Sequence, residues 1–242
     1  MLDKLNHLKD FKYYFQFTLN AYGKEIATNL PSFGQRIDTF KRLSDLIGKE
    51  RVIWRYDPIL TNETYNTDFH KTTFFKIHTE KCMISFINYY KHIRPSLSSQ
   101  NIHPLTLEEI REMAYSFRQS ISSTSIQLNT CTRKVDLSAM GIPAGMCIDR
   151  ELIERLTGYP ISTQKDKNQR DVCRCIESID IGTYDTCFNG CLYCYANTAE
   201  HKPLRNLQKH TPTSPKLIGQ VNDDDIIKDR AMYSLRCDPT LF

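Results

Sequence analysis

The sequence lacks the features of three large classes of protein. No apolar run approaches the roughly 18 residues of a membrane-spanning helix, and Met1 to His7 contain no apolar signal-peptide core. The formal net charge of +4, from 32 Lys and Arg against 28 Asp and Glu, is too weak over 242 residues to favour nucleic acid binding. The composition, 40% hydrophobic and 25% charged, is that of an ordinary globular protein. We therefore expect a cytoplasmic globular protein with no membrane partner, and a nucleic acid partner is unsupported.

Cysteine is the residue present in unusual number. Seven of the nine cysteines lie between positions 131 and 194, namely Cys131, Cys147, Cys173, Cys175, Cys187, Cys191 and Cys194. Disulfides are the alternative explanation, but they are typical of exported chains, and nothing in this sequence signals export. Clustered thiols in a reducing compartment more often bind metal or take part in redox chemistry. The clustered cysteines therefore predict a metal or redox site.

Strands and helices are predicted to alternate along the first 200 residues. The predicted strands are Phe11–Leu19, Arg51–Asp57, Lys81–Asn88, Ser125–Cys131 and Glu177–Gly182. Predicted helices cover residues 37–47, Thr67–His78 and 107–117, the last after a Thr106 and Glu109 capping box, and a short helix follows Asp149. This alternation predicts crossover units and a parallel sheet. We expect one α/β domain over residues 1–200, including the cysteine region 131–194, with residues 201–242 as a tail that packs on it.

Each predicted strand has one apolar and one polar set of alternating side chains. The polar set includes Gln16, Thr18, Asn20, Arg55, Asp57, Gln127, Asn129 and Cys131. A sheet buried between two helical layers would be apolar in both sets, whereas a barrel around a polar ligand would have a polar lumen. An open sheet with one solvated face is the alternative, but the crossover helices argue against it. We therefore expect a ligand-lined parallel barrel, in which Arg55 and Asp57 form either a substrate site or a structural ion pair.

Cys187, Cys191 and Cys194 form a CxxxCxxC triplet. Three thiolates on one tight loop can bind three irons of a [4Fe-4S] cluster and leave the fourth iron without a protein ligand. An open position of this kind is typical of reactive metal sites, because a small molecule can bind there and radical chemistry can start. Zinc is the alternative, and it would need Cys173 or Cys175 as a fourth ligand. Asp180 lies in the polar set of the strand before the triplet, where it either faces the ligand or caps a turn.

The run YDTCFNGCLYCYAN resembles the cluster-binding signature of radical SAM proteins. The resemblance implies that Cys187, Cys191 and Cys194 bind the cluster, that S-adenosylmethionine occupies the free iron, and that Tyr193 lies beside the cofactor. Two departures from that superfamily matter. The triplet follows the last predicted strand rather than the first, and the chain has no Gly-Gly-Glu run of the kind that often binds the methionine amino group.

The chain also resembles a bacterial family, domain of unknown function 1848, over nearly its whole length. The resemblance rests on YYFQFTL, ERVIWRYDP, CIDRELIERL, KDKNQR, CRCIESIDIG and the cysteine triplet. Members of this family resemble longer chains that begin some tens of residues earlier, so this chain is expected to be short at its N-terminus. Together the two resemblances imply a partial or permuted radical SAM-like (β/α) barrel.

The function implied is a radical SAM-type enzyme that cleaves S-adenosylmethionine at a [4Fe-4S] cluster, with a substrate that the sequence does not identify. Such chemistry implies an electron donor such as a flavodoxin or ferredoxin. A non-enzymatic iron–sulfur or zinc-binding protein is the first alternative. A nucleic-acid modification or repair factor is the second, although aromatic and basic stripes that would support it are missing.

The four other clustered cysteines can form a second site. Cys131 ends a predicted strand, Cys147 precedes a helix start, and Cys173 and Cys175 have the CxC spacing that lets both side chains point the same way in an extended chain. Four such thiolates suit a second, closed [4Fe-4S] cluster or a structural zinc ion, with iron–sulfur favoured because the triplet already implies cluster loading. Ordinary buried thiols are the alternative. A topological difficulty remains, because residues that precede a parallel strand lie at the edge opposite Cys131.

Overall fold

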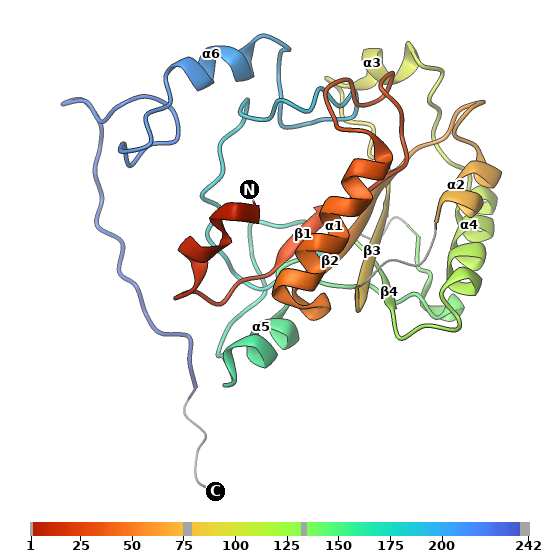
Figure 1. Ribbon diagram of the computed structural model, residues 1–242, viewed down its shortest axis with the longest axis horizontal. Helices are drawn as coiled ribbons and strands as arrows, with labels where there is room; N and C mark the ends of the chain where they lie inside the picture. The colour runs from red at the N-terminus through yellow and green to blue at the C-terminus, as the bar shows by residue number, and fades with distance from the viewer. Residues whose placement is uncertain (1, 75–78, 132–134, 238–242) are drawn as a thin grey trace, which may run out of the picture.

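The computed structural model describes residues 2–74, 79–131 and 135–237, and its centre is a parallel sheet (Figure 1). The strands are β1 (Phe15–Thr18), β2 (Val52–Ile59), β3 (Lys81–Phe86) and β4 (Gln127–Thr130). They are adjacent in the order β1-β2-β3-β4, and each neighbouring pair is parallel. The register places Phe17 beside Trp54, Trp54 beside Cys82, and Cys82 beside Leu128. The predicted α/β class with a parallel sheet is confirmed, while a barrel stays a prediction.

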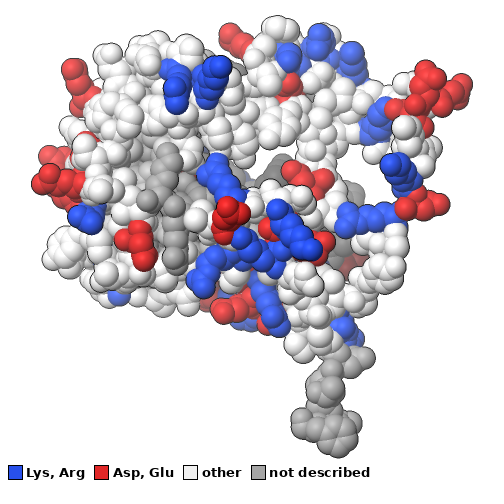
Figure 2. All heavy atoms as spheres, turned by 180° about the vertical axis from the view of Figure 1, so that it is seen from behind, with Lys and Arg blue, Asp and Glu red and all other residues white. Residues whose placement is uncertain are grey.

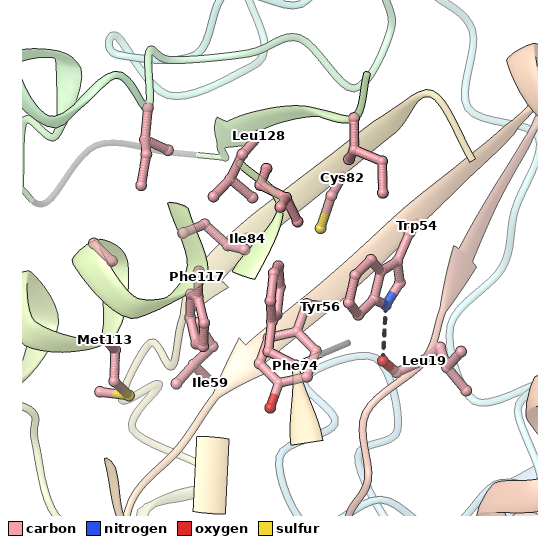
Figure 3. Packing of buried hydrophobic residues seen from close by; sticks show 14 of the residues in the cluster. Leu19, Trp54, Tyr56, Ile59, Phe74, Cys82, Ile84, Met113, Phe117 and Leu128 are labelled. Carbon is pink, nitrogen blue, oxygen red and sulfur yellow. Dashed lines mark hydrogen bonds between the residues drawn. The ribbon is translucent and has the colours of Figure 1, made fainter. Parts of the chain in front are cut away.

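One face of the sheet is covered by helices α1 (Phe33–Ile47), α2 (Thr67–Thr73) and α4 (Leu107–Ser120). Alternate strand residues point into this layer, including Trp54, Tyr56 and Ile84, and they are almost completely buried. Figure 3 shows them in one layer with the rings of Phe74 and Phe117, and the Trp54 Nε1–H donates to the Leu19 carbonyl at 3.0 Å. This face is the main hydrophobic core, as expected for the apolar set of each strand.

Capping residues set the helix boundaries much as the sequence predicts. Thr106 accepts from the Glu109 N–H, and the Glu109 side chain accepts in return, which forms the predicted capping box at the start of α4. Asp149 begins α5 (Arg150–Thr157) by accepting from the Leu152 N–H, and Gly158 ends it with a left-handed φ of 82°. Helix α2 ends earlier than predicted, at Thr73, and positions 75–78 of the predicted helix lie outside the described residues.

Several short elements have no counterpart in the sequence prediction. They are the 3₁₀ helices η1 (Leu2–Leu8), η2 (Lys49–Arg51) and η3 (Ser138–Met140), and the α-helices α3 (Arg94–Ser98) and α6 (Lys202–Gln208). After α6 the chain runs along one side of the molecule and returns to the segment after α5, where the Ser162 N–H donates to the Leu235 carbonyl at 2.7 Å. Among the described residues, no helix combines the length and apolarity needed to cross a bilayer.

The predicted strand Glu177–Gly182 is wrong. Ile176 forms a single bridge with Lys165, and beyond it the chain is irregular, with Ile181 84% exposed. The place beside β4 is taken by the chain at 143–145, because Thr130 donates to the Pro143 carbonyl and accepts from the Gly145 N–H, both at 2.9 Å. A strand needs an open neighbour with which to pair its backbone groups. Residues 177–182 therefore have no place at this edge of the sheet.

Candidate metal and cofactor site

A cavity of about 450 Å³ lies at the carboxyl ends of the strands. The sheet contributes Thr18 from β1, Arg55 and Asp57 from β2, and Cys131 just after β4. The other wall comes from segments far along the chain, and it consists of Tyr90, Arg170, Cys191, Tyr193, Cys194 and Tyr195. Ligands of α/β proteins gather at this edge of the sheet. The cavity is therefore the candidate site.

Arg55 and Asp57 form an ion pair and line the cavity at the same time. The Arg55 guanidinium bonds the Asp57 carboxylate, donates to Gln16 Oε1 at 3.0 Å, and donates to Cys147 Sγ at 2.6 Å. Burial opposes the charge of Arg55, but the Asp57 carboxylate and the thiols of Cys147 and Cys131 raise its pKa above the ordinary value. The pair is thus an ion pair that also lines the cavity, and a role in substrate binding stays a prediction.

The triplet loop is fixed against the chain that follows β1. Cys191 forms an antiparallel bridge with Ala27, and the Leu192 N–H donates to the Ile26 carbonyl at 2.9 Å. Gly190 has a φ of +65°, and a Cβ there would lie 3.2 Å from the Asn29 amide nitrogen. The loop therefore needs glycine at this position, both for its backbone conformation and for the close approach. These contacts set the position of the two cysteines that line the cavity.

The three thiols of the triplet affect one another electrostatically. Burial raises the pKa of Cys191, and the neighbouring thiols of Cys187 and Cys194 raise it further, while a hydrogen bond with Tyr193 lowers it. Cys187 is exposed, whereas Cys191 and Cys194 are partly buried. The Tyr193 ring packs edge-on to Tyr22, with the ring centroids 6.3 Å apart. Cys191, Cys194 and Tyr193 thus line one side of the cavity, and Cys187 is not among the residues that line it.

Asp180 lies apart from this group. It sits in an exposed turn, where its carboxylate accepts from the Gly182 N–H at 2.7 Å, and it is not among the residues that line the cavity. Of the two roles predicted for Asp180, the structure displays the capped turn.

The other four clustered cysteines form a continuous chain of contacts. The Sγ atoms of Cys131 and Cys147 are 3.3 Å apart, the Cys147 and Cys175 thiols are hydrogen bonded, and Cys173 is hydrogen bonded to Cys175. Cys175 Sγ also accepts from the backbone N–H groups of Cys147 at 3.2 Å and Ile148 at 3.3 Å. The predicted topological difficulty does not arise, because Cys173 and Cys175 precede no strand and their segment crosses to the edge where Cys131 lies.

Hydrogen bonds between these thiols shift their pKa values in opposite directions. The bond with the Cys147 thiol is the largest cause that lowers the pKa of Cys175 to about 5 and that of Cys131 to about 7. The same two bonds, together with burial, raise the pKa of Cys147. Cys147 thus contacts two thiols whose pKa values shift in the direction opposite to its own. As the side chains stand, no three His, Cys, Asp or Glu residues in the described part of the chain are arranged to hold a single metal ion.

Some contacts of the site could not be predicted from the sequence. Tyr14 Oη and Gln16 Nε2 both donate to the Cys147 carbonyl, at 2.7 and 2.9 Å, and so fix the backbone of that cysteine. The rings of Tyr90 and Tyr195 meet on the far wall, tilted by 41° with their centroids 5.3 Å apart. Only the fold brings these segments together, because the partners lie far apart in the chain and no motif joins them.

Charged side chains of both signs are mixed on one face of the molecule. On the face seen in Figure 2, basic and acidic side chains are interspersed, including at the centre, where basic groups have acidic neighbours. This pattern agrees with the small net charge of +4.

Comparison with known proteins gives one positive result. Neither the search of curated proteins nor the search of solved structures found a match. The family model described as domain of unknown function (DUF1848) matches residues 1–196, which is most of the chain and includes every cysteine of the site. The chain therefore belongs to the DUF1848 family.

Proposed function

We propose that this protein is an iron–sulfur enzyme of radical SAM type. In this proposal Cys187, Cys191 and Cys194 bind a [4Fe-4S] cluster, and S-adenosylmethionine binds at the fourth iron. The observation that supports it is that Cys191, Cys194 and Tyr193 line the cavity at the carboxyl ends of the parallel strands. A cluster bound there would be open to the space in which a substrate can bind.

The donor set of the triplet fits such a cluster. Its three thiols lie on one fixed loop, and the charges of Cys187 and Cys194 both affect Cys191. In a four-iron cluster each thiolate binds a different iron, so the three sulfurs need not converge on one point as they do around one ion. When bound, the cluster supplies the electron that cleaves S-adenosylmethionine and so permits hydrogen abstraction from a substrate.

The protein's own residues have distinct tasks in this proposal. Tyr193 forms an aromatic wall beside the cluster ligands. Arg55 and Asp57 place a positive and a negative group on the cavity floor, where they can bind the carboxylate and the ammonium group of an amino acid moiety. The neighbouring rings of Tyr90 and Tyr195 offer an aromatic surface for a planar ring. An electron donor such as a flavodoxin or ferredoxin would reduce the cluster.

The barrel belongs to the same proposal. We infer that the four strands are part of a partial or permuted radical SAM-like barrel. Support comes from the side chains of one sheet face, since Gln16, Arg55, Asp57 and Cys131 point away from the helical core and toward the cavity side. A polar sheet face around a cavity is what the lumen of a ligand-binding barrel requires.

Anaerobic reconstitution with iron and sulfide tests the proposal. The wild-type protein, the Cys191→Ser variant and the Cys237→Ser control would be reconstituted, reduced with dithionite and incubated with S-adenosylmethionine. Cys237 is a matched control because it is a partly buried thiol outside both groups of clustered cysteines. We expect four irons per chain at the triplet and release of 5′-deoxyadenosine from the wild type and the control, with both lost in Cys191→Ser.

The outcomes separate the alternatives. A four-iron cluster that yields no 5′-deoxyadenosine would overturn the enzyme proposal and favour a non-enzymatic iron–sulfur protein. Binding of zinc at the triplet with no iron–sulfur cluster would favour a zinc-binding protein and overturn both iron–sulfur proposals.

A further inference from the structure

We infer that Cys131, Cys147, Cys173 and Cys175 form a second metal centre, which binds one soft divalent ion such as zinc at the floor of the same cavity. This site is independent of the triplet. Its four thiols come from three separate parts of the chain: the end of β4, the segment before α5, and the irregular segment before residue 177. The contacts between neighbouring thiols join all four into one group. Convergence of distant segments on neighbouring thiols is the arrangement that a four-cysteine site requires.

The short distance between two of the sulfur atoms, those of Cys131 and Cys147, favours a single ion over a four-iron cluster. Two thiolates on one tetrahedral zinc ion lie about 3.8 Å apart, given a Zn–S bond of about 2.3 Å. The Sγ atoms of Cys131 and Cys147 are 3.3 Å apart, close to this value. Thiolates of a four-iron cluster bind different irons and lie much farther apart. The structure therefore reverses the preference for iron–sulfur at this site that the sequence alone suggested.

Metal binding would replace the hydrogen bonds between the thiols. Each thiol that binds the ion loses its proton to solvent as its sulfur forms a bond to the metal, so the S–H···S contacts are replaced by metal–sulfur bonds. The sulfurs need a small rearrangement, since they do not surround one point as they stand. Cys173 and Cys175 can supply it, because they lie on a segment without regular secondary structure.

Groups around the thiols are placed to stabilise the negative charge of such a centre. Four thiolates and one divalent ion carry a net charge of −2. Arg55 donates to Cys147 Sγ at 2.6 Å, and the backbone N–H groups of Cys147 and Ile148 donate to Cys175 Sγ. Tyr14 and Gln16 hold the Cys147 backbone by its carbonyl. Hydrogen bonds from surrounding groups to the residues that bind a metal orient these ligands and tune their charge.

The position of the centre links it to the cavity. Cys131 and Arg55 line the cavity from the sheet side, and Cys191 and Cys194 line it from the loop side. The ion would therefore lie next to any ligand that binds between the two cysteine groups.

Cobalt binding to a chain without the triplet thiols tests the inference directly. In the variant Cys187→Ser/Cys191→Ser/Cys194→Ser, we expect one Co²⁺ per chain with the thiolate-to-metal absorption and the tetrahedral visible bands of a four-thiolate site. Zinc should displace the cobalt one for one. Adding Cys147→Ser should abolish stoichiometric binding, whereas adding Cys237→Ser should leave it unchanged. Because the triplet is absent from all these proteins, failure of the proposed enzyme function would not affect the result.

A measurement on the wild-type chain covers the case in which Cys147→Ser does not fold. Alkylation with iodoacetamide, read by peptide mass spectrometry, should spare Cys131, Cys147, Cys173 and Cys175 in the zinc-loaded protein and modify them after chelation. Equal alkylation with and without zinc would overturn the inference, as would stoichiometric cobalt binding that survives Cys147→Ser. A two-iron, two-sulfide centre, or a Cys131–Cys147 disulfide in place of metal, would overturn the assignment of one ion.

Discussion

The two faces of the sheet differ in what covers them and in what their side chains do. On one face, Trp54, Tyr56 and Ile84 pack against α1, α2 and α4 in an apolar core. On the other, Arg55, Asp57 and Cys131 face a cavity closed by irregular segments. Successive residues of a single strand serve the two faces, because side chains alternate along a strand. A strand such as β2 can therefore contribute to stability and to a chemical site at once.

The two faces also differ in what holds the covering segments to the sheet. The helical layer is held by the burial of large apolar side chains in the main core. The segments over the other face are held by a smaller apolar cluster around Ile53, Met83 and Leu152 and by hydrogen bonds, such as those from Tyr14 and Gln16 to the Cys147 carbonyl. The helical face should therefore dominate stability, and the cavity face should dominate ligand and metal binding.

The largest expected effect on stability is in the helical layer. Phe117 is completely buried and stacks on Phe74 with ring centroids 4.2 Å apart. We expect Phe117→Ala to lower the free energy of unfolding by about 3–5 kcal/mol, because it removes buried apolar surface and leaves a cavity. The comparison on the cavity face is Asn129→Ala. It should cost less than about 1 kcal/mol because, within the described part of the chain, the Asn129 side chain makes one hydrogen bond, a long one of 3.5 Å to the Pro143 carbonyl. Urea unfolding measures both, and equal losses would contradict the contrast between the faces.

A buried histidine in the helical layer should make stability depend on pH. His70 lies between the Tyr56 hydroxyl and the Leu60 carbonyl, and its burial lowers its pKa from 6.5 to about 4. The unfolded chain therefore binds a proton more readily than the folded chain between these values, so stability is lost as the pH falls through this window. We expect His70 to account for about 2 kcal/mol of the loss between pH 7.5 and pH 5.

The control for this pH dependence is His70→Gln, which cannot titrate. Its unfolding free energy at pH 7.5 should be lower than that of the wild type, but its further loss at pH 5 should be smaller by about 2 kcal/mol. Parallel pH profiles for the two proteins would show that His70 is not the titrating group.

A glycine on the cavity face tests how the second cysteine group is positioned. A Cβ at Gly145 would lie 2.8 Å from both the Asn129 Cβ and the Met83 sulfur. We expect Gly145→Ala to destabilise the protein by about 1–3 kcal/mol and to weaken metal binding at the second centre, because the segment that carries Cys147 must move off the sheet. Gly34→Ala is the matched control in α1, where a Cβ would meet nothing within 4 Å, and it should keep or slightly raise stability. Unchanged metal affinity in Gly145→Ala would contradict this account of positioning.

The smallest expected effect is at Asp180. Its carboxylate caps an exposed turn through the Gly182 N–H, so Asp180→Ala should change the unfolding free energy by no more than about 0.5 kcal/mol. A loss of S-adenosylmethionine affinity of tenfold or more in this variant would instead place Asp180 at the ligand, as the sequence allowed.

Local patterns in the sequence were enough to predict much of the fold. Alternation in Arg51–Asp57 identified both the core residue Trp54 and the cavity residues Arg55 and Asp57, and capping residues located the starts of α4 and α5. These features depend on residues close together in the chain. A sequence motif likewise identified the triplet, because its three cysteines belong to one loop.

Features that depend on which segments meet could not be predicted in this way. Glu177–Gly182 alternates like a strand, but the edge it would need is occupied by residues 143–145. The meeting of Cys131, Cys147 and Cys175, and the hydrogen bonds of Tyr14 to Cys147, arise from irregular segments whose paths no local pattern fixes. The sequence could propose that these cysteines share a site, and only the fold could place that site at the cavity.

We propose above that the triplet binds a cluster with one iron open to the cavity. Electron paramagnetic resonance can test this on the reconstituted, dithionite-reduced protein, with spectra recorded before and after addition of S-adenosylmethionine. The measurement should be done in a Cys147→Ser background, so that the signal belongs to the triplet alone. We expect the signal of a reduced four-iron cluster that changes when S-adenosylmethionine is added. A four-iron signal that stays the same, or no cluster at all, would overturn the proposal.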